Sequence, residues 1–544
     1  MTATSAPEES HASSGPALSR LQAPRSRSPL MESARRLERY AVLVIALVAV
    51  LVRFPYLATD ASRDEAGFLL VGQQWHAGGS SLYGNYWVDR PPLLITIFRV
   101  AAQLGGLVPL RLIGCLATVL VILGTAHLAR RLGSPGSAPW AALTAAALCV
   151  TPLLGGQAVN GELLSAPFVV VGLIAVLTAI DHPGERRATV AAALAGAAMI
   201  CSLLVKQNMA DVAVFASVVL LVAWRRGEIA TPRLVRSILA AAAGAMACLV
   251  VVALWTMAHG TSVVGVFDAM YPFRIEAGQV MALSNRSAAD ARLRALALCW
   301  LLSGGAVLMA VTGQALVSRR LRSTAVWALV ATVLFDVVSI TLGGSYWDHY
   351  LIQLVIPIAV LSGLLVAHHL PGARMLLVVV ALAAAVAVGV DLSGTHTTAG
   401  TSLGQAVREV SHPRDTIVTT WGHANVTRAS GLSSPYPYLW SLPARTLDPK
   451  LAALDSLLSG PSAPTWFVTW HDVNTWRFHG GGAVTARVLA EHYNPVAQVN
   501  GHTIYLHRDV QRAVPRLSPP STDLSAASAS SNLPISDRLR KELP

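Results

Sequence analysis

Two adjacent carboxylates, Asp64 and Glu65, open the stretch RDEAGFLLVGQQWHAGGSSLYGNYWVDRPPLL. A carboxylate in this position could accept a proton from an attacking hydroxyl group. The aromatic residues Tyr83, Tyr86 and Trp87 follow, and aromatic rings suit both sugar faces and a membrane interface. The structural alternative is an acidic helix start surrounded by an aromatic belt, which requires no chemistry.

A second group of polar residues lies in LLVKQN, where Lys206 and Gln207 interrupt an apolar sequence. Lys206 is the only lysine between residues 40 and 391, a segment otherwise supplied with arginine. The compact ammonium of a lysine could hold a phosphate group as a point charge. The alternative is a lysine whose aliphatic chain reaches along a span to the membrane surface.

Two further segments carry polar residues at the start of an apolar stretch. Glu162 opens one in GGQAVNGELLSAP, and the other, LGGSYWDHYLIQLVIP, contains Asp348, His349 and Tyr350. His349 could bind phosphate or orient an acceptor group. The structural alternatives are a carboxylate stabilised by a helix dipole and a His-Tyr pair that anchors a span at the interface.

Membrane helices must position these residues. A hydrophobic fraction of 53%, a charged fraction of 13% and a mean hydropathy of +0.53 are too apolar for a soluble chain of 544 residues. Only helices and closed barrels satisfy the backbone in lipid, and the apolar stretches approach the ~20 residues that a helix needs to cross a bilayer. We predict a polytopic α-helical membrane protein with about eleven spans, and up to about thirteen. The spans lie near residues 40–57, 108–129, 136–154, 162–180, 188–205, 208–224, 235–258, 295–317, 323–342, 350–369 and 373–391.

The distribution of arginine predicts the orientation of these spans. Arg35, Arg36 and Arg39 precede the first span, so the N-terminus should be cytoplasmic, and every second loop after it also carries arginine. The remaining loops should be extracytoplasmic: 58–107, 155–161, 206–207, 259–294 and 343–349, together with everything after residue 391. Loop 259–294 is an exception because it also carries arginines, but long loops respond less to the charge bias.

This topology brings the candidate groups to one face of the membrane. Asp64, Glu162, Lys206 and His349 belong to four separate loops or span ends, and the arginine pattern alone places them all outside. We therefore expect one extracytoplasmic site rather than several unrelated polar positions.

The segments outside the spans have distinct compositions. PPLLITIFRVAAQLGG, from Pro91, is short and interrupted by Arg99, which favours a helix at the membrane surface or partly inserted in it over a full span. Residues 395–510 alternate β-rich runs with helix-like stretches, which predicts a small extracytoplasmic α/β domain. Residues 1–34 and 511–544 have the composition of disordered ends.

The order of these motifs resembles the GT-C superfamily of membrane glycosyltransferases over the whole membrane region. The chain has a first span and then an outer loop that opens with Asp-Glu and continues with a tyrosine and a charged residue before Pro-Pro-Leu. This order is similar to that in bacterial relatives of protein O-mannosyltransferases and of the lipid A aminoarabinose transferase. Those enzymes use polyprenyl-phosphate sugars. The resemblance implies that Asp64 is the catalytic carboxylate, with Glu65 in the same motif. It also implies substrate-binding roles for Tyr83, Arg90, Glu162, Lys206, Gln207, His349 and Tyr350.

This chain departs from the pattern at Gly67-Phe68, where many relatives carry a basic or small residue followed by Tyr. The departure concerns acceptor recognition, since it lies directly beside the acidic pair. The sequence therefore predicts the superfamily and does not identify the acceptor.

We predict an inverting glycosyltransferase that moves a sugar from a polyprenyl-phosphate donor to a cell-envelope glycan, lipid or protein at the outer face of a bacterial cytoplasmic membrane. We expect no cofactor and no essential metal ion, although Asp64, Glu65 and His349 could gather a divalent ion. A transporter is one alternative, which rests mainly on Asp336 in VLFDVVSI, and a non-catalytic lipid-binding envelope protein is the other. The net charge of +12 comes largely from loop arginines, so we expect no nucleic-acid partner.

Overall fold

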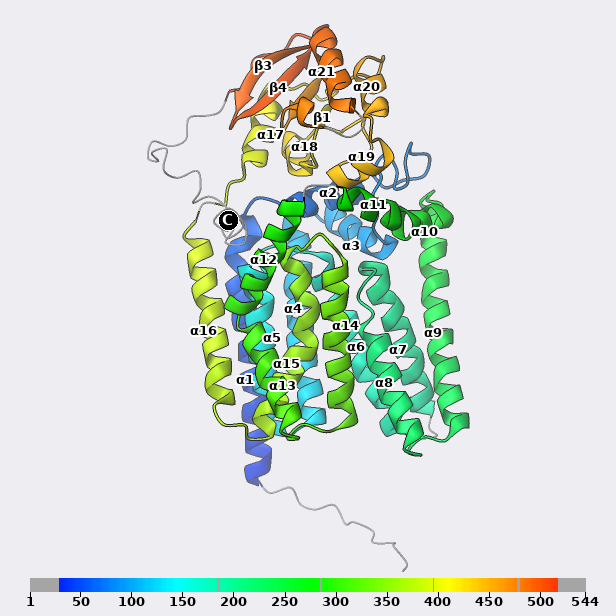
Figure 1. Cartoon of the computed structure of the whole chain (residues 1–544), viewed down its shortest axis with the longest axis vertical. Helices are drawn as coiled ribbons and strands as arrows, with labels where there is room; N and C mark the ends of the chain where they lie inside the picture. The colour runs from blue at the N-terminus through cyan, green and yellow to red at the C-terminus, as the bar shows by residue number, and fades with distance from the viewer. Residues whose placement is uncertain (1–28, 183–185, 284–285, 395, 477–479, 517–544) are drawn as a thin grey trace, which may run out of the picture.

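The structure, a computed structural model, describes residues 29–182, 186–283, 286–394, 396–476 and 480–516 of the chain. Three layers follow one another along its long axis (Figure 1). Upright helices form a bundle, short helices lie across one end of it, and a small α/β domain sits on those short helices. We call the end of the bundle beneath this domain the domain end.

The upright helices and one tilted helix, Arg286–Leu302, cover the predicted spans. They are α1 (Pro29–Arg53), α4 (Leu107–Leu132), α5 (Ala138–Val150), α6 (Gly161–Asp181), α7 (Arg186–Val205), α8 (Asp211–Arg225), α9 (Thr231–Ala258), α12 (Arg286–Leu302), α13 (Gly305–Val317), α14 (Thr324–Leu342), α15 (Val355–Ala367) and α16 (Ala373–Leu392). Among the described residues, eight helices are long and apolar enough to cross a membrane, and the pair α12 and α13, bent by 68°, makes up to nine. The shorter α5 and α8 have 13 and 15 residues. The multi-pass helical fold is confirmed.

Burial separates the central helices from the peripheral ones. The span Asp348–Ala367 consists of the 3₁₀ helix η4 (Asp348–Leu354) and α15, and 89% of its most apolar stretch is enclosed by other helices. The corresponding figure for α9 is 6%, so α9 borders the bundle and packs mainly against α7. Gly196 lies against Ala241, and Gly244 lies against Ala193, at distances that leave no room for a side chain. Small residues of this kind let two membrane helices approach closely.

A layer of short elements lies across the domain end (Figure 1). It contains η1 (Phe54–Ala58), α2 (Arg63–Gln73), α3 (Pro92–Gln103), α10 (Val263–Met270) and α11 (Pro272–Ala282). The helix α3 covers the segment from Pro91 and has 12 residues, well below the ~20 that a span requires. This segment is therefore too short to count as a span, and the predicted side of the membrane for each later loop is unchanged.

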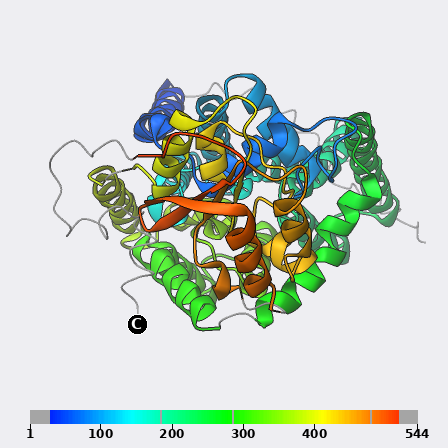
Figure 2. The same ribbon diagram turned by 90° about the horizontal axis from the view of Figure 1, so that it is seen from above.

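The C-terminal domain is a four-stranded sheet with helices, so the predicted α/β class is confirmed. Its helices are α17 (Ala399–Val410), α18 (Ala424–Ser430), α19 (Ser441–Leu447), α20 (Ala452–Leu458) and α21 (Gly481–His492), and its strands are β1 (Ile417–Thr419), β2 (Trp466–Thr469), β3 (Tyr493–Val499) and β4 (His502–His507). The strand order is β1-β2-β4-β3, with β1 parallel to β2 and the other pairs antiparallel. Seen from above, the domain lies over the bundle (Figure 2).

The edge strand β3 was not predicted, because its sequence YNPVAQV contains a proline and polar residues. The pairing with β4 shifts register between Pro495 and Ala497, at the kind of irregular edge position where a sheet tolerates proline. At the other end of the chain, α1 begins at Pro29, so residues 29–34 are helical although disorder was expected there. Residues 1–28 and 517–544 of the two expected tails lie outside the described residues.

Candidate active site

The first turn of α2 directs its two carboxylates differently. Asp64 is half-buried, and its Oδ1 accepts a hydrogen bond from Nε1 of Trp440 in the C-terminal domain at 2.9 Å. Glu65 is fully buried. A capping box fixes the turn: Ser62 Oγ accepts from the Glu65 amide, and the Glu65 carboxylate accepts from the Ser62 amide. One member of the acidic pair therefore contacts the C-terminal domain, and the other faces the bundle.

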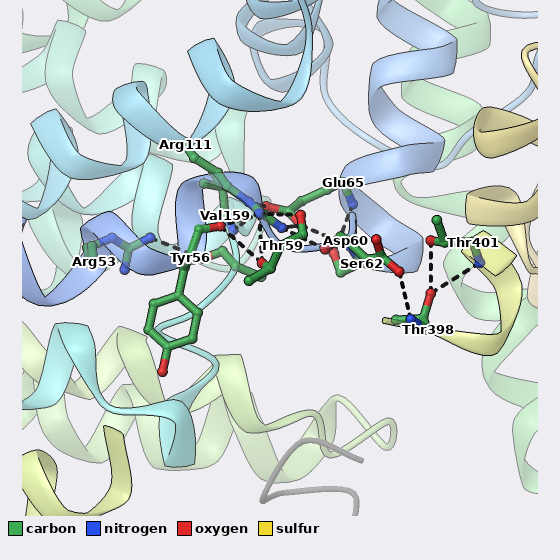
Figure 3. Close-up of polar contacts among 11 residues, drawn as sticks. Arg53, Tyr56, Thr59, Asp60, Ser62, Glu65, Arg111, Val159, Thr398 and Thr401 are labelled. Carbon is green, nitrogen blue, oxygen red and sulfur yellow. Dashed lines mark hydrogen bonds and ion pairs between the residues drawn. The ribbon is translucent and has the colours of Figure 1, made fainter. Parts of the chain in front are cut away.

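Glu65 forms a bidentate ion pair with Arg111 in the first turn of α4 (Figure 3). Its Oε1 accepts from Nε of Arg111 at 3.1 Å and from the amide of Val159 at 3.0 Å. Its Oε2 accepts from Nη2 of Arg111 at 3.0 Å, in addition to the Ser62 amide. The planar guanidinium matches a carboxylate in this geometry, which makes the pair strong. Both oxygens of Glu65 are thus engaged in holding α2 against the bundle.

Arg111 also fixes the chain that leads into α2 (Figure 3). Its guanidinium donates to the carbonyl oxygens of Tyr56, of Thr59 at 2.7 Å and of Asp60 at 2.8 Å. The side chain of Asp60 in turn accepts from the amide of Thr398, the N-cap residue of α17, at 2.6 Å. One buried arginine therefore sets the path from η1 to α2, and that path reaches the C-terminal domain.

Cationic side chains lie at the domain end of the bundle. Lys206 follows α7 directly, and its Nζ lies 2.7 Å from Oε1 of the buried Glu162 and 4.9 Å from the ring centroid of Tyr350. Nδ1 of His349 lies 3.4 Å from Oδ1 of Asp348. The charge of Glu162 also acts on His349. Residues from α6, α7 and η4 thus form one polar cluster.

Asp89 joins two arginines in the same region. Its Oδ1 lies 2.7 Å from Nη1 of Arg90, and its Oδ2 lies 2.7 Å from Nη2 of Arg274 on α11. The backbone oxygen of Asp89 accepts from the side-chain amide of Gln207 at 3.3 Å. Burial lowers the pKa of Arg274, although the charge of Asp89 opposes that effect. The loop before α3, the end of α7 and α11 therefore meet at Asp89.

The charges acting on Arg90 connect these clusters with the acidic pair. Burial by itself would lower the pKa of the Arg90 guanidinium. The charges of Asp89 and Asp64 act in the opposite direction. Tyr350 and Glu162 add to them, and the net effect raises the pKa of Arg90. Of the residues singled out in the sequence, Asp64, Arg90, Glu162, Lys206, Gln207, His349 and Tyr350 thus lie around one site.

Tyr83, which was expected to bind substrate, is fully buried beneath this site. Its hydroxyl donates to the carbonyl oxygen of Arg90 at 2.7 Å, and burial raises its pKa well above the ordinary value. The nearby Trp87 donates its amide hydrogen to the carbonyl of Pro437 at 3.0 Å. Tyr83 thus supports the loop that presents Arg90, while Trp87 joins that loop to the C-terminal domain.

Trp440 lies directly on α2. A Cβ atom at Gly67 would come within 2.4 Å of the indole ring, so a side chain at this position would displace Trp440. The rings of Phe68 and Trp440 have centroids 5.0 Å apart. Gly67-Phe68, where this chain departs from the family pattern, is therefore the contact that places the indole N–H on Asp64.

Trp440 also lines a cleft of the C-terminal domain. The other aromatic residues of its lining are Trp421, Tyr436, Tyr438 and Trp476. The ring of Tyr438 lies 6.3 Å from that of Trp87, measured between centroids. An aromatic-lined cleft therefore begins at the residue that holds Asp64.

Metal binding is not apparent at these positions. In the described part of the chain, no group of three or more His, Cys, Asp or Glu residues is arranged to hold a metal ion. Glu65 could bind one only by giving up its bonds to Arg111. A metal-independent reaction stays a prediction.

Comparison with solved structures identifies the fold. ArnT from Cupriavidus metallidurans, solved bound to undecaprenyl phosphate, matches with a TM-score of 0.59 and 15% identity, over 88% of this chain and 99% of that one. The apo oligosaccharyltransferase of Archaeoglobus fulgidus matches with a TM-score of 0.51 and 12% identity, over 84% of this chain and 73% of that one. Both are GT-C superfamily members. The chain has the GT-C fold. No family model and no curated protein matches its sequence.

Four residues that organise this site were not assigned a role from the sequence: Asp89, Arg111, Arg274 and Trp440. Arg274 could have been noticed, because it is one of the arginines that make loop 259–294 an exception to the positive-inside pattern. Arg111, in the first turn of an otherwise apolar predicted span, was a second signal. Asp89 and Trp440 carry no comparable mark in the sequence.

We expect Arg111→Ala to lower the free energy of unfolding by about 3–5 kcal/mol, because it leaves the buried Glu65 carboxylate uncompensated. The melting temperature of the purified protein in detergent measures this effect. Arg131→Ala is the matched control, since Arg131 pairs with the exposed Asp181. Equal losses in the two variants would contradict the role of Arg111.

Proposed function

We propose that the protein is an inverting glycosyltransferase that moves a sugar from a polyprenyl-phosphate donor to a cell-envelope acceptor at the outer face of a bacterial cytoplasmic membrane. The observation that carries this proposal is that the charges of Asp64, Tyr350 and Glu162 all act on Arg90, while Tyr350 and Glu162 also lie beside Lys206, at the domain end of a membrane bundle. A carboxylate base and a cationic phosphate site are the two parts that such a transfer requires. The GT-C fold supports the same reaction class.

The donor phosphate binds among Lys206, Arg90 and Arg274 in this proposal. Each of the three carries N–H donors on a side chain that a carboxylate holds in place, Glu162 for Lys206 and Asp89 for the two arginines. Lys206 lies at the end of a membrane helix, where a lipid phosphate would reach it while the polyprenyl tail stays among the helices. Undecaprenyl phosphate is bound in the structure of ArnT, which shares this fold.

The reaction is a single displacement in this proposal. The acceptor hydroxyl attacks the anomeric carbon while its proton passes to the Asp64 carboxylate. The bond between the anomeric carbon and the phosphate oxygen breaks on the opposite face, which inverts the anomeric centre. The cations stabilise the charge that the departing polyprenyl phosphate carries away. Glu65 acts as a positioning residue, because its oxygens are bound to Arg111.

The acceptor approaches Asp64 from the C-terminal domain. Trp440, which belongs to that domain and donates to Asp64, supports this path. The acceptor is a cell-envelope glycan, lipid or protein. In this orientation the domain lies outside the cell and the N-terminus in the cytoplasm, as the arginine pattern predicts.

We expect Asp64→Asn to reduce turnover by about 10²- to 10⁴-fold, the usual contribution of a general base, while the protein stays folded. The measurement is transfer by purified protein in liposomes supplied with a panel of labelled polyprenyl-phosphate sugars. Asp268→Asn, at an exposed position of α10, is the control and should keep full activity. Turnover of Asp64→Asn within a few-fold of wild type would remove Asp64 from the role of base.

Trp440→Phe keeps a ring against Phe68 but removes the donor to Asp64. A hydrogen bond to a charged group contributes about 1.5–3 kcal/mol, so we expect kcat to fall roughly 10- to 100-fold. Trp466→Phe is the matched control, because Trp466 lies in the core of the same domain and its Nε1 has no hydrogen-bond partner among the residues that the structure describes. Trp466→Phe should retain the wild-type kcat and melting temperature. If Trp440→Phe retains them as well, the indole does not position Asp64.

A further inference from the structure

Two carboxylates that the proposed reaction does not use lie inside the bundle. Asp211 is in the first turn of α8, and Asp336 is in the middle of α14. Neither side chain is exposed, at 0% for both. Asp336 is the residue on which the transporter alternative rested. Its Oδ1 accepts from the side-chain amide of Gln353 in η4 at 2.8 Å.

Three of the four carboxylate oxygens have no hydrogen-bond partner within the described part of the chain: both oxygens of Asp211 and Oδ2 of Asp336. The two groups also act on each other electrostatically. Two fully buried ionised carboxylates repel each other, and the single hydrogen bond from Gln353 replaces little of the hydration that they lose. A positive charge must therefore accompany the pair in the folded protein.

The neighbouring side chains do not supply that charge. Lys206, the nearest cation along the chain, is paired with Glu162 and lies over Tyr350. In the described segments no ion pair joins a cationic side chain to Asp211 or Asp336. Two thiols on the elements packed against the pair lie within helices, Cys201 in α7 and Cys248 in α9, and they contact each other. The other charged or titratable groups on these elements lie at helix ends: Asp348, His349 and Tyr350 at the domain end, and Asp181, Arg186, Arg187, Arg225, Arg233 and Arg236 at the far end.

We propose that Asp211 and Asp336 share one proton and form a proton-binding site within the membrane bundle. The protonated carboxyl group donates to the ionised one, which gives partners to two of the three unsatisfied oxygens and leaves one negative charge instead of two. A metal ion fits less well, because Mg²⁺ and Ca²⁺ require about six or more oxygen ligands. The nearest amides, of Gln353 and Asn208, are bonded to each other.

The proton site is linked to the loop that carries Lys206 and Gln207. The Asn208 side chain donates to Oε1 of Gln353 at 2.8 Å and to Oγ of Ser339 at 3.1 Å. Gln353 is the residue that donates to Asp336. The protonated pair therefore holds this loop in place through two hydrogen bonds in series. This role is independent of which substrate the site binds.

Infrared spectroscopy of the full-length protein in lipid nanodiscs tests the proposal directly. The wild type should show the carbonyl stretching band of a protonated carboxylic acid, and the band should shift in D₂O. The double variant D211N/D336N keeps similar side-chain shapes and should lose this band. D181N, a replacement at the exposed end of α6, should keep it. A wild-type spectrum without the band, or a band that persists in D211N/D336N, would overturn the shared proton.

Thermal melting provides a second measurement that does not depend on transferase activity. The folded protein holds a proton that the unfolded chain releases, so the wild-type melting temperature should fall as the pH rises through the neutral range. In D336N this fall should become smaller. Exchanging choline for sodium or potassium at constant ionic strength should change neither protein. A cation-dependent rise in the wild type that is absent from D336N would identify a metal ion as the compensating charge and reject the proton.

Discussion

The ion pair between Glu65 and Arg111 is the constraint on which the layer at the domain end depends. It joins the first turn of α2 to the first turn of α4, and the same guanidinium holds the carbonyl oxygens of the chain between η1 and α2. A buried charge of either sign is costly alone, so each partner fixes the other. Asp64, the next residue in the turn, is therefore presented at a defined place without being part of the network.

A second constraint acts on the candidate site. Its cationic side chains repel one another, so they can lie close together only where carboxylates lie between them. Asp89 lies between Arg90 and Arg274, and Glu162 lies beside Lys206. These carboxylates reduce the repulsion among the cations and fix the directions of the long side chains. The loop before α3, the end of α7 and the surface helix α11 are held together as a consequence. The arrangement suits an anionic headgroup delivered from the bilayer.

The C-terminal domain contributes to the site instead of serving only as a cover. Trp440 lies against α2 because residue 67 is glycine, and its indole N–H reaches Asp64 from the side opposite the bundle. The aromatic cleft continues from the same ring. In the proposed transfer, a lipid-borne donor and an envelope acceptor meet at one carboxylate, which has the bundle on one side and the C-terminal domain on the other.

The sequence by itself determined the multi-pass helical fold, the α/β class of the C-terminal domain and the common end of the bundle at which Asp64, Lys206 and His349 lie. These features follow from apolar run length, arginine distribution and local alternation, all of which are local properties of a chain. Only the tertiary structure decided that Glu65 anchors α2 and that Trp440 contacts Asp64. These contacts join residues 46 and 376 positions apart, and a hydrogen bond between such distant residues leaves no periodic or compositional trace in the sequence.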